Sequence, residues 1–423
     1  MTLEFNQIVE QVYRMGAMLD KLDFDVTESV SLAAARFAAL DDVAAVKERI
    51  EWVRQSDISG YRGAATLDTP DVVSEPINLI VPEPSLPAEA TIIAADGSQI
   101  YPDELAAVHY YLINLGIFIY HHGSNATPEQ ITLPDLRFHK AHVHDRYGQI
   151  IRNRTVDDRR TAAEMKALAH EVWLQRHGVR PLIALYDNRL LFLPGNDAGD
   201  GSDLMGIYQS AMVQLHDADA LLAGYIDNPF RAKRVIQLLF LMSLKDENEV
   251  RERQRELSQG GDMDGLRDQI FFYQMLKPGE RSALMVQNSP QNKEFRDRGY
   301  NYEIAFFYLK VYNEARSKVI RVDLPIWVAR DPEKVNALHA LLLHQCKLQG
   351  RNPYPYAITR ADELAYVGGK DRSKLQELIN VQVRRVRKEL VGSTLTAKSR
   401  GKEIARSEKR YHDVWGQGII DDQ

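Results

Sequence analysis

The sequence predicts an α/β protein in which a mixed sheet is flanked by helices, with a helical arm before this domain and a helical region at its end. Two observations carry the prediction. Between residues 90 and 244 the hydrophobic pattern changes from strand-like runs to alternating helical and strand-like segments. Hydrophobic residues make up 44% of the 423 residues and charged residues 26%, which is typical of a globular protein with a sizeable core.

The chain begins with a segment, residues 1–56, whose apolar side chains recur at helical spacing. This segment predicts two helices, which could form a hairpin or an arm that contacts a second copy. Five prolines follow between residues 70 and 87, so residues 57–89 are expected to form a linker. The main domain is expected at 90–392, and residues 393–423 are expected to be a loosely structured, basic and polar tail.

The main domain opens with an apolar run, 91–96, that ends in Asp96 and is followed by a Gly-Ser turn. Stretches at 107–120 and 135–144, rich in β-branched and aromatic residues, predict two strands that form an antiparallel meander with the first. The next segments are a helix at 157–177, a strand at 181–187, a helix at 203–218, a strand at 220–226 and a helix at 229–244. This order predicts an RNase H-like fold.

The rest of the domain mixes short strands with helices. It is expected to contain a polar helical region at 247–275, strands near 281–286, 303–311 and 318–323, and helices at 333–349, 359–367 and 372–390. No period of 20–50 residues recurs, so a solenoid is excluded.

Two aspartates, Asp96 and Asp187, each end an apolar strand. In an α/β sheet, groups that bind ligands collect at strand ends. Carboxylates brought together there repel one another unless a cation neutralises them, and hard divalent ions with oxygen ligands suit such a position. Two ions about 3.5–4 Å apart can activate a water and stabilise the leaving oxygen of a phosphodiester. The competing interpretation is that each aspartate caps a turn.

A third carboxylate would favour the metal site. Glu164 lies in the predicted helix before the Asp187 strand, with Arg160 four residues earlier on the same helical face. Glu171 is the alternative, two turns further along the helix. On local sequence alone, either glutamate could be an ordinary solvated residue.

The sequence shows no sign of membrane insertion or export. The longest apolar run, residues 108–120, has 13 residues, whereas a bilayer-spanning helix needs about 20. The first residues lack the pattern of a signal peptide. The single cysteine, Cys346, excludes an intrachain disulfide and a multi-thiolate zinc site. We therefore expect a cytoplasmic protein whose metal ligands would be carboxylates and imidazoles.

The net charge of −6 argues against a protein that coats nucleic acid with its whole surface. Between residues 370 and 410, however, 13 Lys and Arg residues stand against 5 Asp and Glu residues. The densest part of this region contains Arg384, Arg385, Arg387 and Lys388. It is either a solvated helix face or a surface that contacts DNA phosphates.

Two further patterns are weaker. His139, His142 and His144 could suggest a metal cluster, but partly exposed histidines on a strand are the favoured interpretation. The glycine-rich loop at 195–206 lacks dinucleotide-binding spacing, and Gly368-Gly-Lys370 is followed by Asp371 instead of Ser or Thr. The chain is therefore not expected to be an ATP-driven motor.

Several short motifs, taken together and in order, resemble the NurA nuclease family from about residue 90 to about 380. They are Ile93-Ala-Ala-Asp-Gly-Ser98, the Arg160 to Glu164 helix segment, Leu185-Tyr-Asp187, Ala223-Gly-Tyr-Ile-Asp227, Pro278-Gly-Glu-Arg-Ser282, Arg321-Val-Asp-Leu-Pro325, Asn352-Pro-Tyr-Pro-Tyr356 and Ala361-Asp-Glu363. The resemblance implies an RNase H-like, metal-dependent DNA nuclease that forms dimers and works with the hexameric ATPase HerA in DNA end resection.

The resemblance also implies site residues. Asp96, Glu164 and Asp187 match the family's acidic ligands, and Tyr354 matches a late tyrosine. Eight residues after this tyrosine the family commonly has a histidine, where this sequence has Asp362. An aspartate can bind a hard metal, but it cannot act as a neutral imidazole base near pH 7.

The sequence thus predicts a nuclease that uses one or two Mn²⁺ or Mg²⁺ ions, acts on single- or double-stranded DNA ends and takes part in double-strand break repair. A HerA-type hexameric ATPase and a second copy of the chain are the expected protein partners. The alternative is a non-catalytic DNA-binding adaptor of a DNA-translocating ATPase, for which Asp362 in place of histidine is the sequence indication.

Overall fold

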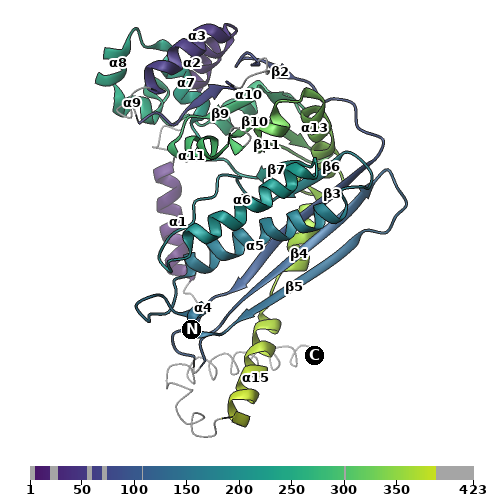
Figure 1. Cartoon of the computed structure of the whole chain (residues 1–423). Coiled ribbons are helices and arrows are strands. Elements are labelled where there is room, and N and C mark those ends of the chain that lie inside the picture. Colours follow the sequence, from purple (N-terminus) through teal and green to yellow (C-terminus); the bar gives the residue numbers. More distant parts are fainter. Residues whose placement is uncertain are drawn as a thin grey trace, which may run out of the picture. The chain divides into compact units, whose positions relative to one another are not determined.

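The computed structural model describes residues 5–19, 27–54, 60–68, 74–106, 108–299 and 302–386 (Figure 1). The chain divides into two compact units. Unit 1 comprises residues 1–83, 227–312 and 317–322, and unit 2 comprises residues 84–226, 313–316 and 323–423. Every site residue predicted from the sequence belongs to unit 2.

Unit 1 starts with three helices where the sequence predicts two. They are α1 (Phe5–Leu19), α2 (Thr27–Ala38) and α3 (Val43–Arg54). The break between α2 and α3 comes from Asp42, whose side chain accepts hydrogen bonds from the backbone N–H groups of Ala44 and Ala45. An aspartate in this capping position favours the start of a new helix over continuation of the previous one.

The expected linker, residues 57–89, contains two strands of unit 1. β1 (Ala64–Thr66) pairs antiparallel with β9 (Met285–Gln287), and β2 (Ile80–Val81) pairs antiparallel with β8 (Arg281–Ser282). Strands of three and two residues are too short to show the alternation by which strands are recognised in a sequence.

The remaining strands of unit 1 are β10 (Ile304–Tyr312) and the first six residues of β11 (Ser317–Pro325), and the strand order is β1-β9-β10-β11. Its other helices are α7 (Arg234–Ser243), α8 (Glu247–Glu252), α9 (Gln254–Gln259), α10 (Asp268–Met275) and α11 (Pro290–Arg298), with a 3₁₀ turn, η2 (Gly261–Met263). Aromatic side chains fill the core, where Phe272 stacks on Tyr308 at 4.7 Å and meets Phe37 edge-on.

Unit 2 is built on a mixed sheet with the strand order β7-β6-β3-β4-β5. The strands are β3 (Ala90–Ile100), β4 (Tyr111–His122), β5 (Glu129–Arg137), β6 (Leu182–Tyr186) and β7 (Leu221–Ile226). β3, β4 and β5 pair antiparallel, whereas β6 pairs parallel with both β3 and β7. The predicted meander and the following parallel strands are both present, but the third strand of the meander is β5 at 129–137 and not the predicted stretch 135–144, where the short helix α4 lies instead.

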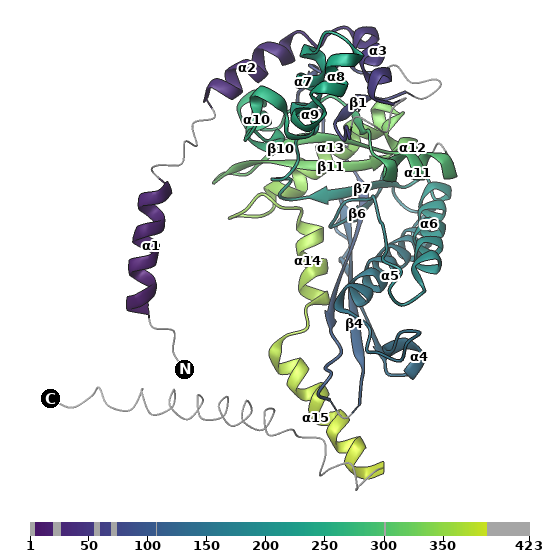
Figure 2. The same cartoon turned by 90° about the vertical axis from the view of Figure 1, so that its left-hand side faces the viewer.

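The helices of unit 2 are α4 (Lys140–Val143), α5 (Asn153–Leu174), α6 (Gly201–Asp217), α12 (Ile326–Ala329), α13 (Pro332–Lys347), α14 (Tyr356–Ala365) and α15 (Gly369–Val386). In Figure 2 the strands around β4 are seen nearly edge-on, with α5 and α6 on one side and α14 on the other. The predicted mixed sheet flanked by helices is confirmed. No helix in the described ranges combines the length and apolar character that crossing a membrane requires.

Candidate active site

The register between two parallel strands brings Asp96 and Asp187 together. The last pair of the β3–β6 ladder is Ala95 with Tyr186, so the two aspartates are the next residue on each strand. Neighbouring strands lie about 4.7–4.9 Å apart. The expectation that Asp96 ends its strand is wrong, because β3 continues to Ile100 along β4. Asp96 instead lies just after the point where the pairing of β3 with β6 stops, and from there β3 continues in its pairing with β4.

Glu164 approaches the same point from α5. Its side chain is 5% exposed, and its Oε2 accepts a hydrogen bond from the Tyr186 hydroxyl at 3.2 Å. Its Oε1 lies against Gly97, where a Cβ atom would be only 2.5 Å away. A side chain at position 97 would therefore displace the glutamate. From the sequence, Asp96 and Gly97 suggest a turn. In the structure both residues lie within β3, and Glu164 of α5 contacts the strand at Gly97.

Asp96 and Gly97 point to opposite faces of the sheet, as successive strand residues do. Asp96 pairs with Gly116 on β4, over which α14 passes, whereas Gly97 faces α5 and Glu164. Asp96 and Glu164 therefore approach β3 from its two faces. The two side chains could contact one ligand only beyond the last β3–β6 pair, where β6 no longer lies beside β3.

Arg160 holds the arrangement on the α5 side. Its guanidinium donates to the Gly97 carbonyl at 2.8 Å, and its Nε lies 3.4 Å from Glu164 Oε1. The geometry of the second contact is that of an ion pair and not of a hydrogen bond, and Glu164 Oε1 is a buried acceptor without a hydrogen-bond donor among the described residues. The i−4 spacing of Arg160 was visible in the sequence, but its contact with β3 was not.

The electrostatics of the carboxylates reflect their burial and their mutual repulsion. Burial is the main cause that raises the pKa of Asp96 to about 6; the Gly97 N–H counteracts it, and the charges of Asp187 and Asp362 add to it. Burial likewise raises the pKa of Glu164 to about 8, with Arg160 opposing the shift and Asp96 adding to it. Both carboxylates are therefore costly to ionise unless positive charge is supplied.

A hard divalent cation fits this donor set. Glu164 offers a buried oxygen without a hydrogen bond, and Asp96 carries a charge that its acidic neighbours destabilise. In the described part of the chain, no three His, Cys, Asp or Glu side chains are already grouped as ligands of one ion.

The structure brings Glu164, and not the alternative Glu171, to this edge. Glu171 is also largely buried, and burial raises the pKa of its carboxyl, but the charged groups that act on it are His170 and Glu129. Glu129 begins β5, at the other side of the sheet from β6. Glu171 therefore lies on the β5 side of the sheet, away from Asp96 and Asp187.

Tyr354 contacts the site directly, since its hydroxyl donates to Asp187 Oδ1 at 2.5 Å. Its ring packs edge-on against Tyr225 with the ring centroids 5.1 Å apart, and this contact fixes its orientation. Asp362, on α14, is exposed and acts on the site through its charge, which raises the pKa of Asp96.

Helix α14 is fastened to the sheet by small and polar residues. Gly116 allows the close approach, because a Cβ atom there would lie 2.3 Å from the Ala361 carbonyl. Ser98 and Asn114 donate hydrogen bonds of 2.5 and 2.8 Å to the Ala365 carbonyl at the end of the helix. The helix that carries Asp362 is thus bound to the strands that carry Asp96.

The comparison with protein families agrees with the resemblance found in the sequence. The NurA domain family matches residues 90–367. The chain belongs to the NurA family. The crystal structure of the NurA nuclease from Sulfolobus solfataricus matches with 14% sequence identity, covers 87% of this chain and 97% of the other, and has a TM-score of 0.39. No curated protein sequence matches the chain.

The structure also describes the three histidines and part of the basic region singled out in the sequence. The expectation that the histidines lie on a strand is wrong, because β5 ends at Arg137 and His142 lies on the short helix α4. His144 Nε2 lies 3.2 Å from His109 Nδ1. In the basic region, Arg384 and Arg385 are exposed on α15, whereas Arg387 and Lys388 lie outside the described residues.

Proposed function

We propose that the protein is a DNA nuclease that hydrolyses phosphodiester bonds with one or two Mn²⁺ or Mg²⁺ ions. The observation that carries the proposal is that Asp96 and Asp187 follow the last pair of the β3–β6 ladder, that Glu164 lies against the next residue of β3, and that the three acidic groups act on one another's charge, in a chain of the NurA family. The destabilised charges of Asp96 and Glu164 support a cation as their natural neighbour.

In this proposal Asp96, Glu164 and Asp187 bind the cation, and Asp362 adds a fourth oxygen donor from α14. The bound ion supplies Lewis-acid stabilisation of the charge that develops on the phosphate. Tyr186 and Arg160 orient Glu164 through its two oxygens. Tyr354 orients Asp187 by donating a hydrogen bond to its Oδ1. Such partners of ligating side chains fix their geometry.

The family resemblance extends the proposal to the partners. We propose that the protein forms a homodimer, works in the cytoplasm with a HerA-type hexameric ATPase, and takes part in DNA end resection during double-strand break repair. Gel filtration of the chain with and without such an ATPase tests both interactions. Co-elution is the expected result, and separate elution at micromolar concentrations contradicts the ATPase partnership.

The basic region, with Arg384, Arg385, Arg387 and Lys388, is proposed to contact DNA phosphates. Changing all four to Gln is expected to weaken binding equally across sequences and to flatten its dependence on salt, because fewer counterions are released. Fluorescence anisotropy with labelled duplexes over a range of KCl concentrations measures both effects. An unchanged salt slope would remove this region from the DNA contact.

The central test is cleavage of labelled single- and double-stranded DNA with Mn²⁺, Mg²⁺ or EDTA. The wild-type protein is expected to cleave only with a divalent ion. Asp96→Asn and Asp187→Asn are each expected to abolish cleavage at an unchanged melting temperature, because each removes a charged ligand. Full activity in either variant contradicts the assignment. A wild-type protein that binds DNA and never cleaves it would favour the adaptor function.

A further inference from the structure

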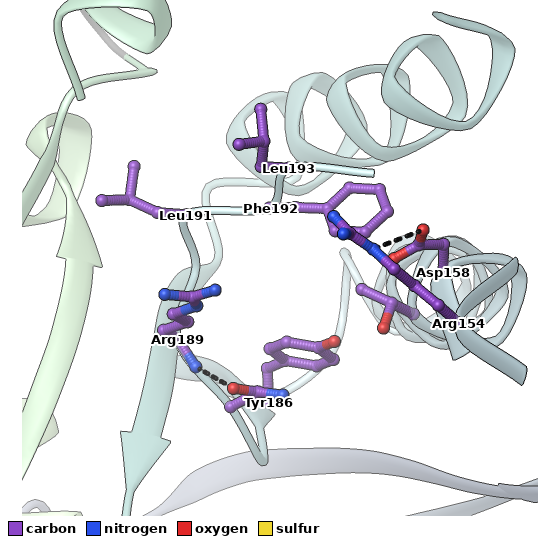
Figure 3. A pocket seen from close by; sticks show the side chains of 9 residues that line it. Arg154, Asp158, Tyr186, Arg189, Leu191, Phe192 and Leu193 are labelled. Carbon is purple, nitrogen blue, oxygen red and sulfur yellow. Dashed lines mark hydrogen bonds and ion pairs between the residues drawn. The ribbon is translucent and has the colours of Figure 1, made fainter. Parts of the chain in front are cut away.

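A pocket of about 290 Å³ lies beside the carboxylates in unit 2 (Figure 3). Its walls come from the first turns of α5, which supply Arg154 and Asp158, and from Tyr186 at the end of β6 with the segment that follows, which supplies Arg189 and Phe192. The volume suits a small group and not a folded partner, since pockets for drug-sized ligands begin at about 300 Å³.

The pocket adjoins the proposed active site through two consecutive residues. Tyr186 lines the pocket with its ring, while its hydroxyl donates to Glu164. Asp187 follows, and Arg189 comes two residues after Asp187, so their Cα atoms are at most about 7.6 Å apart. A ligand that reaches from the carboxylates into the pocket passes along this short segment.

The charge of the pocket favours an anion. Arg154 Nε lies 3.8 Å from Asp158 Oδ2, so these two charges largely compensate each other. The Asp158 carboxylate also accepts a hydrogen bond from the Gly195 N–H at 2.8 Å. Arg189 is exposed, and its guanidinium has no hydrogen-bond or ion-pair partner among the described residues. The lining therefore carries one uncompensated positive charge.

Contacts within the chain hold the walls of the pocket in place. The loop that closes it is fixed to α5 by the Gly195–Asp158 hydrogen bond and by Arg159, whose Nε donates to Asp200 at 2.8 Å. Phe192 packs on Tyr208 with the ring centroids 4.9 Å apart. A preformed site costs less ordering entropy on binding than a mobile one.

We propose that this pocket binds a phosphodiester group of the DNA strand, next to the phosphate held at the carboxylates. Arg189 is the principal contact and Arg154 the second. The inference rests on the proposed nuclease function. It answers a physical problem of that function: a cluster of acidic side chains repels the DNA backbone, so a positive group nearby is needed to hold the strand in register for cleavage.

The test measures binding separately from cleavage. A fluorescein-labelled thymidine 12-mer is titrated with protein in EDTA at several KCl concentrations, and anisotropy gives the affinity. Arg189→Met is expected to bind about tenfold more weakly, the loss of one charge-assisted contact. Its plot of log affinity against log salt should be shallower by about 0.7. Arg154→Met should lose less affinity for the oligonucleotide than Arg189→Met. Arg330→Met, at an exposed arginine that does not line the pocket, is the matched control and should bind like the wild type.

A second set of oligonucleotides identifies the group bound. Each carries one uncharged methylphosphonate linkage, moved one position at a time. One position should weaken binding to the wild type and leave binding to Arg189→Met unchanged. If no position distinguishes the two proteins, Arg189 acts as a diffuse charge and the phosphate pocket is wrong.

The outcomes separate this inference from the nuclease proposal. If the wild type binds and cleaves DNA while Arg189→Met and Arg154→Met bind as tightly with the same salt slope, the pocket assignment is overturned and the nuclease stands. If the wild type neither binds nor cleaves DNA, the proposed function fails and the pocket assignment fails with it. Equal melting temperatures exclude misfolding as the cause of a weak variant.

Discussion

Two buried carboxylates, one in each unit, are surrounded very differently. Asp268 in unit 1 is fully buried and accepts four hydrogen bonds, from the Tyr308 hydroxyl and from the backbone N–H groups of Arg234, Val235 and Ile236. Glu164 in unit 2 is 5% exposed, and one of its oxygens accepts none from the described residues.

The difference distinguishes a structural carboxylate from a candidate ligand. Burial raises the pKa of Asp268, but its four hydrogen-bond donors oppose that effect, and they place the carboxylate at the start of α7, where a negative charge favours the helix. Glu164 has burial without a full set of donors, an arrangement that destabilises its charge until a cation arrives.

The largest expected effect concerns the role of Glu164. Glu164→Gln should lower the rate of Mn²⁺-dependent cleavage about a hundredfold or more, because losing a charged ligand removes several kcal/mol of charge stabilisation. Glu171→Gln, the matched control on the same helix, should keep cleavage within about twofold of the wild type. Single-turnover assays at saturating protein measure both rates, and a reversed ranking would exchange the two assignments.

For Asp268, the structural carboxylate of unit 1, we predict a loss of stability and not of activity. Asp268→Ala leaves three backbone donors and a buried tyrosine hydroxyl without their acceptor and should cost about 3 kcal/mol. At about 2–4 °C per kcal/mol, the melting temperature should fall by about 6–12 °C. Below that temperature, activity per folded molecule should match the wild type. A stable Asp268→Ala protein without activity would place Asp268 in the catalytic machinery.

The raised pKa of Glu164 predicts how stability depends on pH in the absence of divalent ions. The folded protein keeps the proton up to about pH 8, whereas the unfolded chain releases it near 4.5, so this residue makes the protein less stable as pH rises through that interval. Asp96 adds the same sign between about 3.8 and 6. In EDTA, the melting temperature should fall more steeply with rising pH for the wild type than for Glu164→Gln. Mn²⁺ should raise the melting temperature most at high pH, and parallel curves would contradict a destabilised Glu164.

The smallest expected effect is that of Asp362, which is exposed. If it is a ligand, Asp362→Ala should weaken Mn²⁺ binding, whereas Asp362→His should retain it, since imidazole also binds this ion. Calorimetric titration of Mn²⁺ into the three proteins measures the affinities. Equal affinity in all three would remove Asp362 from the site and leave Asp96, Glu164 and Asp187.

The sequence predicted the elements whose signals are local. The apolar runs that end at Asp96 and Asp187 are visible without the fold, and the strand-helix order around them follows from periodicity. The pairing of Glu164 with Gly97 was not predictable, because it depends on the α5 helix meeting one glycine across the sheet. The short strands β1 and β2 were missed because their partners lie about 200 residues away. Tyr354 and Asp362 were found through the family resemblance alone.

The packing of α14 against β3 and β4 also determines how early the site can form while the protein is being synthesised. The hydrogen bond from Asn114 to Ala365 joins residues 251 positions apart. At about 5–20 residues per second, a ribosome needs about 10–50 s to make the intervening chain. During that time the nascent strands would carry Asp96 without the helix that bears Asp362 or the tyrosine that orients Asp187. The arrangement delays assembly of the acidic cluster until nearly the whole NurA domain has been made.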